Sequence, residues 1–154
     1  MPPESTHDAM LKPEERLLYV IFCDQARTED TRKGLYIGVY GGTLIVEGDF
    51  PAFLASLSIA VCVRPVSTEE KIRVSIQLPG EPNPHDFDKV HSASHPDDSI
   101  VWIINIAPFV CVKPGKVRVH VAFHDGSKIE KSLRVMSRSE YKETSLLWPS
   151  TTGS

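Results

Sequence analysis

Four side chains with possible chemistry lie close together near the start of the chain. Cys23, Asp24, Arg27 and Glu29 fall between two apolar segments. If the chain turns there, the Arg27 guanidinium can bridge the carboxylates of Asp24 and Glu29 by charge-assisted hydrogen bonds and fix the flanking strands. The alternative role for these three side chains is a polar recognition patch at one end of the domain. A thiol nucleophile at Cys23 would need a base and an oxyanion site, and no local motif supplies either.

A second group with possible chemistry lies in the polar, proline-rich segment 79–98. Its candidate metal ligands are Asp86, Asp88, His91 and His95. The two histidines are four residues apart, which suits chelation on a helix but separates them by about 13 Å on a strand. Because no helical pattern surrounds them, we expect a solvated loop across one edge of the domain. A divalent metal site is the alternative.

The residues around these groups alternate between apolar and polar in the pattern of β-strands, most clearly in segment 113–135. Val119 and Val121 alternate there with polar or small residues, which is typical of a strand with one buried face and one wet face. The dipeptide Asp125-Gly126 then tolerates the positive backbone angles of a tight reversal. The segment therefore predicts an antiparallel hairpin.

Strands of similar pattern recur along the rest of the chain. They are predicted at 17–23, 33–40, 43–46, 57–64, 71–78 and 100–107. Because the 12 prolines also favour short strands, the pattern predicts an all-β fold of seven to eight strands. This fold is an antiparallel two-layer sandwich of immunoglobulin-like type, and a barrel is the alternative. The predicted divisions are a flexible N-terminal arm at 1–15, a sandwich domain at 16–136 and a C-terminal extension at 137–154.

The composition argues against several classes of function. The net charge of −3 comes without the basic stripe that nucleic-acid binding needs. The longest apolar run, at 100–112, is too short to cross a bilayer as a helix. Three cysteines without a secretory signal predict free thiols in the cytoplasm, with a Cys62–Cys111 disulfide as the alternative. We expect no nucleic acid, no membrane and no cofactor.

Two segments and one proline resemble a known protein family. Segment 22–29 reads FCDQARTE, segment 34–41 reads GLYIGVYG, and Pro51 follows them. The Cys-Asp-x-x-Arg-x-Glu turn and the Gly-Val-Tyr-Gly motif resemble the N-terminal half of a family of small uncharacterised bacterial and phage-associated proteins. The resemblance covers roughly residues 17–136 and departs from the family pattern at 79–98. It implies a β-sandwich of bacterial or phage-associated origin, and it implies no activity.

The predicted strand 100–107 carries apolar residues on both faces. If its even-numbered positions face the core, Val101 and Ile103 lie on the opposite face, which is then unusually apolar for a sheet surface in water. We expect something to cover that face. The candidates are the segment 79–98, the C-terminal extension with Trp148, or a partner chain.

Together these observations predict a non-enzymatic protein–protein interaction module, whose partner is another protein or a second copy of the chain. Its candidate binding residues are Asp24, Arg27, Glu29, Val101, Ile103 and Trp148. One alternative is a small-ligand or sugar-binding sandwich with a pocket lined by Tyr36, Tyr40 and Trp102. The other is a metal-dependent enzyme that uses the histidines and aspartates of 85–95.

Overall fold

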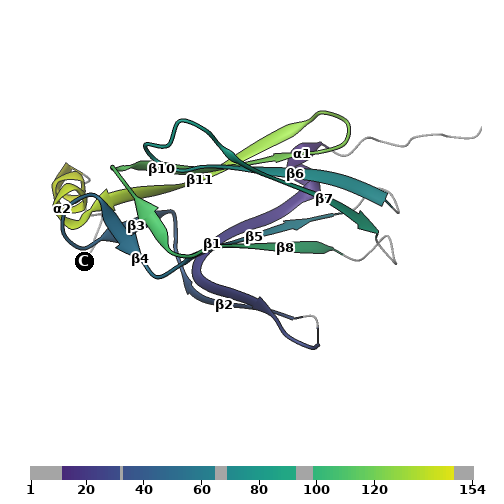
Figure 1. Ribbon diagram of the computed structural model, residues 1–154, viewed down its shortest axis with the longest axis horizontal. Coiled ribbons are helices and arrows are strands. Elements are labelled where there is room, and N and C mark those ends of the chain that lie inside the picture. The colour runs from purple at the N-terminus through teal and green to yellow at the C-terminus, as the bar shows by residue number, and fades with distance from the viewer. Residues whose placement is uncertain (1–11, 32, 65–68, 93–98, 148–154) are drawn as a thin grey trace, which may run out of the picture.

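The computed structural model describes residues 12–31, 33–64, 69–92 and 99–147 (Figure 1). Within these ranges the chain forms eleven strands and two helices. In chain order they are α1 (Pro13–Arg16), β1 (Leu17–Thr28), β2 (Gly34–Val39), β3 (Thr43–Val46), β4 (Ala52–Leu54), β5 (Leu57–Val63), β6 (Glu69–Gln77), β7 (His85–Ser92), β8 (Ile100–Ile106), β9 (Phe109–Cys111), β10 (Gly115–Ala122), β11 (Lys128–Ser137) and α2 (Arg138–Leu147).

Two large sheets lie face to face (Figure 1). One has the strand order β2-β1-β5-β8 and the other β3-β11-β10-β6-β7, while β4 and β9 form a small third sheet. All neighbouring strands among the described residues are antiparallel, except that β3 runs parallel to β11. The prediction of an all-β, largely antiparallel sandwich is therefore confirmed, although the described residues form eleven strands rather than the predicted seven to eight. The immunoglobulin-like assignment stays a prediction.

The core lies between the two large sheets and follows the alternation of the sequence. On β10, Val117, Val119 and Val121 are fully buried, while Arg118 between them is exposed. All seven residues of β5 are buried, because β1 and β8 flank this strand within the sheet. Burying one such side chain contributes about 1.5 to 3 kcal/mol. The sandwich body is thus held chiefly by its central strands.

The predicted hairpin at 113–135 is confirmed. β10 pairs along its whole length with β11. In the turn, the Asp125 carboxylate accepts hydrogen bonds from the backbone N–H of Ser127 at 2.9 Å and from its hydroxyl at 2.5 Å. Gly126 has a φ of 85°, which an L side chain rarely adopts. The turn residues therefore act as the sequence predicts.

Arg16, the last residue of α1, anchors the start of the sandwich to this same turn. Its side chain is buried, and its guanidinium carbon lies 4.0 Å from the centre of the Phe123 ring. Its Nη1 atom is 3.6 Å from Oδ2 of Asp125. The buried charge is stabilised by these partners. Helix α1 covers the last residues of the predicted N-terminal arm, of which residues 1–11 lie outside the described ranges.

The prediction of a loop at 79–98 is wrong for residues 85–92. They form β7, the outer strand of the five-stranded sheet, paired with β6. The physical reason is alternation: Phe87 is half-buried, whereas its neighbours Asp86 and Asp88 are exposed, as in an outer strand with one face on the core. Residues 93–98 lie outside the described ranges.

The C-terminal extension begins as a helix. The Ser137 hydroxyl accepts the backbone N–H of Glu140 at 3.2 Å and so caps α2. Serine followed by glutamate three residues later is a sequence signal for a helix start, and it was available at 137–140. α2 packs against β11 and β3 (Figure 1), and Trp148 lies outside the described residues.

Candidate functional site

Strand β1 extends beyond the end of its pairing with β5. It pairs with β5 only as far as Cys23, which lies opposite Ser58. Beyond that point, residues 25–28 pair with β2 alone. The two strands leave the body together as a projecting hairpin, at the lower right of Figure 1. We call residues 24–39 the hairpin arm. A two-stranded hairpin is only marginally stable in water, so contacts outside its own ladder must hold it in place.

The base of the hairpin arm is fixed around Asp24. Its carboxylate accepts a hydrogen bond from the Tyr40 hydroxyl, and its backbone carbonyl accepts one from the Ser56 hydroxyl at 2.8 Å. Gly38 has a φ of 67°, and the Asp24 carboxylate fills the space where a Cβ atom would lie. Only glycine fits there. Burial, and then the hydrogen bond to Asp24, raise the pKa of Tyr40, so its hydroxyl remains a donor.

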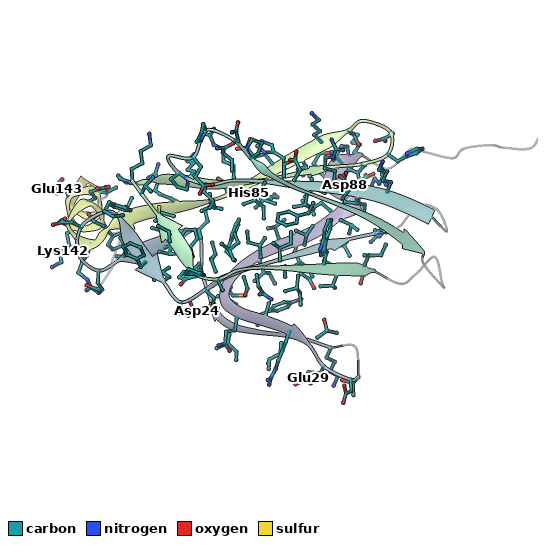
Figure 2. The ribbon with its side chains drawn as sticks, in the orientation of Figure 1. Asp24, Glu29, His85, Asp88, Lys142 and Glu143 are labelled. Atoms are coloured by element: carbon teal, nitrogen blue, oxygen red, sulfur yellow. The ribbon has the colours of Figure 1, made fainter. Side chains whose placement is uncertain are left out.

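The predicted bridges from Arg27 to Asp24 and Glu29 are wrong. Arg27 is exposed and forms no ion pair with any described residue. Figure 2 shows Asp24 where the hairpin arm leaves the body and Glu29 at its far tip. The reason is that β1 stays extended through Thr28, and five residues of strand span about 16 Å. The segment predicted as a turn is mostly strand.

Two tyrosines tie the hairpin arm to the body. The hydroxyls of Tyr19 on β1 and Tyr36 on β2 are 3.0 Å apart, and their rings meet edge to face at 6.3 Å. Trp102 lies elsewhere, with its ring edge to face against Phe87 of the opposite sheet at 6.4 Å. Tyr36, Tyr40 and Trp102 therefore belong to three separate contacts. The alternative of a sugar pocket lined by these three residues stays a prediction.

An open hollow of about 280 Å³ lies beside the hairpin arm. It is lined by Gln25, Ala26, Arg27, Leu35, Ile37, Ser56, Ser58, Asn105 and Ala107. Ser58 is buried, and its hydroxyl donates to Oδ1 of Asn105 at 2.5 Å, which leaves the Asn105 NH₂ group as a donor. The one ionisable side chain in this lining is Arg27. The hollow therefore offers hydrogen-bond donors and a positive charge.

The outer strand of the hairpin arm presents apolar side chains to water. Ile37 is 49% exposed and Val39 is 57% exposed. Both lie on β2, which pairs with a neighbour on one side only among the described strands. Large exposed apolar residues on a free strand edge are typical of a surface that another chain covers. The apolar residues of β2 were visible in the sequence, but a strand pattern alone does not show whether their side chains are exposed.

Val101 and Ile103 lie on β8, at the opposite edge of the same sheet. Both are half-buried, and their partners on β5, Cys62 and Ala60, are almost fully buried. The described part of the C-terminal extension does not cover them, since α2 packs on β11 and β3. Nor does the described part of 79–98, because β7 belongs to the other sheet.

Two of the four candidate metal ligands, Asp86 and Asp88, are engaged in side-chain pairs. The Ser75 hydroxyl donates to Asp86, and Arg73 forms two hydrogen bonds with Asp88, at 2.6 and 3.1 Å. Figure 2 shows Asp88 on the far side of the sandwich from the hairpin arm. The side chain of His91 and all of His95 lie outside the described set. Within that set, no three His, Cys, Asp or Glu side chains converge as metal ligands.

The three cysteines are free and buried. Burial raises the pKa of the Cys23 thiol, with a further contribution from the neighbouring Asp24 carboxylate. Burial likewise raises the pKa of Cys111. A raised pKa lowers the thiolate fraction, so these cysteines are poor nucleophiles. No disulfide joins Cys62 and Cys111.

Comparison with known proteins adds little. No protein-family model matches the sequence, and no curated protein matches it. Among solved structures, a β-glucosidase of Erythrobacter marinus is similar at 11% identity and a TM-score of 0.40, over 77% of this chain and 15% of that one. The chain thus spans about a seventh of that enzyme, and a TM-score this low supports no argument. The resemblance to bacterial and phage-associated proteins stays a prediction. Neither helix in the described ranges has the length and hydropathy to cross a membrane.

Proposed function

We propose that this chain is a protein–protein interaction module without catalytic activity, and that the hairpin arm is its binding element. The observation that carries the proposal is the free edge of β2, where Ile37 and Val39 stand about half exposed. An extended segment of a partner protein adds to such an edge through backbone hydrogen bonds, and its alternate side chains supply specificity. The buried free thiols support a cytoplasmic location, and the resemblance at 22–41 supports a bacterial or phage-associated origin.

The size of the hollow favours a protein over a free small molecule. Its volume of about 280 Å³ lies at the lower limit of pockets that enclose small ligands, about 300 to 1,000 Å³, and it is open. One side chain of a bound segment would fill it. Because Arg27 is its sole ionisable lining residue, the partner side chain that enters should be acidic.

The candidate binding residues then divide by role. Arg27 contacts the partner, because it lines the hollow and pairs with no described carboxylate. Asp24 positions the hairpin arm through Tyr40, and so acts on binding indirectly. Glu29 lies at the tip of the arm and also borders a second shallow hollow with Arg27. It would contact only a partner that reaches the tip.

The test is capture of proteins from an extract of the native host by the full chain and its variants. The double substitution Ile37→Lys with Val39→Lys places two charges on the edge of β2. The control is Ser132→Lys, an exposed position on β11 of the other sheet. We expect the wild type and the control to capture the same protein and the arm variant to lose it, with all three folded by circular dichroism. Equal capture by the arm variant would refute the proposal.

A further inference from the structure

The four outer strands of the two large sheets differ in how their edges are protected. An exposed strand edge invites pairing with another chain, and proteins block it with short strands, charges, irregular backbone or a covering element. Strand β3 has four residues and α2 packs against it. Strand β7 carries the exposed charges of Asp86 and Asp88. In β2, the positive φ of Gly38 limits the regular edge to residues 34–37, which we assign to the partner protein.

Strand β8 has none of these protections within the described chain. Its seven residues read IVWIINI, without a charge, a proline or a glycine. All seven pair with β5 on one side, and no described strand pairs on the other side. Its first five residues, before the exposed Asn105, are all apolar, and such a run is typical of a strand with neighbours on both sides. β8 therefore has the composition of an inner strand at the position of an outer one.

We propose that a second copy of this chain pairs its β8 antiparallel to this one about a two-fold axis. The two four-stranded sheets would then join into one sheet of eight strands. A charge-free strand can oppose its own copy without repulsion, and antiparallel pairing of identical strands generates the closed two-fold symmetry of most homodimers. Val101 and Ile103 of each copy would meet their counterparts across the new ladder, which completes their burial.

The residues around β8 are compatible with its pairing to a second copy of the chain. On its inner face, Trp102 already packs against Phe87 of the opposite sheet. On its outer face, the neighbouring residues Ala60 and Cys62 of β5 are small and already buried, so the apolar side chains left partly exposed there are Val101 and Ile103 of β8. The hairpin arm lies at the opposite edge. Self-association and partner binding can therefore occur together.

The test is sedimentation velocity of the full chain with two matched substitutions at the two edges of one sheet. Val101→Lys adds a charge to β8, and Val39→Lys adds the same charge to β2. Both positions can direct a lysine amine to water, so both variants should fold. We expect the molar mass from sedimentation to be twice the 17.1 kDa of one chain for the wild type and for Val39→Lys. For Val101→Lys we expect the mass of a single chain.

Two results would overturn the proposal. One is a Val101→Lys protein that remains dimeric. The other is a monomeric wild type; if that protein dimerises once residues 148–154 are removed, the chain's own tail is the occupant. If Val101→Lys fails to fold, hydrogen exchange of the wild type decides. In the dimer all amides of residues 100–106 should exchange slowly, whereas in a monomer every second one points away from β5 and exchanges quickly; fast exchange at alternate residues of β8 would refute the pairing.

Discussion

The β10–β11 hairpin and the hairpin arm are built from the same elements, two antiparallel strands and a short turn, yet they have opposite environments. On β10, every second side chain is fully buried between the sheets. On β2, no residue is buried, and Ile37 and Val39 are about half exposed. Strand pairing alone therefore does not place a hairpin in the core. The first hairpin stabilises the fold, and the second is available to a partner.

The largest expected effect comes from the same leucine truncation in each hairpin. Leu133 on β11 is fully buried, whereas Leu35 on β2 is half-buried beside the hollow. Leu133→Ala should lower the free energy of unfolding by about 2 to 5 kcal/mol through lost burial and a cavity. Leu35→Ala should cost less than about 1 kcal/mol. Urea denaturation measures both values. Similar losses would contradict the view that one hairpin lies in the core and the other does not.

The next effect concerns the glycine with positive φ in each hairpin. An alanine at either site costs about 1 to 2 kcal/mol of backbone strain. At Gly126 the space for a Cβ atom is empty, whereas at Gly38 the Asp24 carboxylate fills it. Gly38→Ala should therefore also displace the Tyr40 bond and cost about 1 kcal/mol more than Gly126→Ala. Thermal melting of the two variants gives the order, and the reverse order would contradict this account of the arm's base.

A smaller effect on stability, but a large one on binding, is expected for Arg27→Ala. Because Arg27 pairs with no described carboxylate, its loss should change the free energy of unfolding by less than about 0.5 kcal/mol. Loss of a charge-assisted contact should weaken partner binding about tenfold or more. Urea denaturation measures the effect on stability, and a binding titration measures the effect on affinity. A destabilised variant with unchanged affinity would return Arg27 to a purely structural role.

The smallest effect is a pH dependence at the β10–β11 turn. Hydrogen bonds from Ser127, and then the charge of Arg16, hold the pKa of Asp125 below its ordinary value. A depressed pKa means that the contribution of Asp125 is full above that ordinary value and is lost as the pH falls through the folded-state pKa. Wild type should therefore melt higher than Asp125→Asn at neutral pH, and the two should converge in acid. A constant difference across pH would exclude this linkage.

Most of the sandwich could be predicted from the sequence because its strands have one buried face. Val119 and Val121 alternate with polar or small neighbours, and Asp125-Gly126 marks the turn, so the β10–β11 hairpin was readable without a structure. The helix α2 also had a readable start, because Ser137 and Glu140 form a cap signal, but the polar composition of the segment concealed it.

The hairpin arm could not be predicted, because it has no buried face. Residues 24–28 are mostly polar, and exposed strand residues have the same composition as turn residues. The proposed Arg27 bridges assumed that turn, and the extended backbone separates Asp24 from Glu29. The half-burial of Val101 and Ile103 could not be predicted either, because it depends on the place of β8 at the edge of its sheet. Sheet order depends on tertiary contacts that local patterns do not contain.

Hydrogen exchange of the chain with and without its captured partner tests most directly whether the hairpin arm is the binding element. Amides on the free edge of β2, within residues 34–39, should exchange quickly in the free chain. In the complex they should slow markedly, together with Asn105 at the hollow, while β10 and β11 should keep their rates. Protection that appears on the outer face of the five-stranded sheet, with residues 34–39 unchanged, would contradict the account.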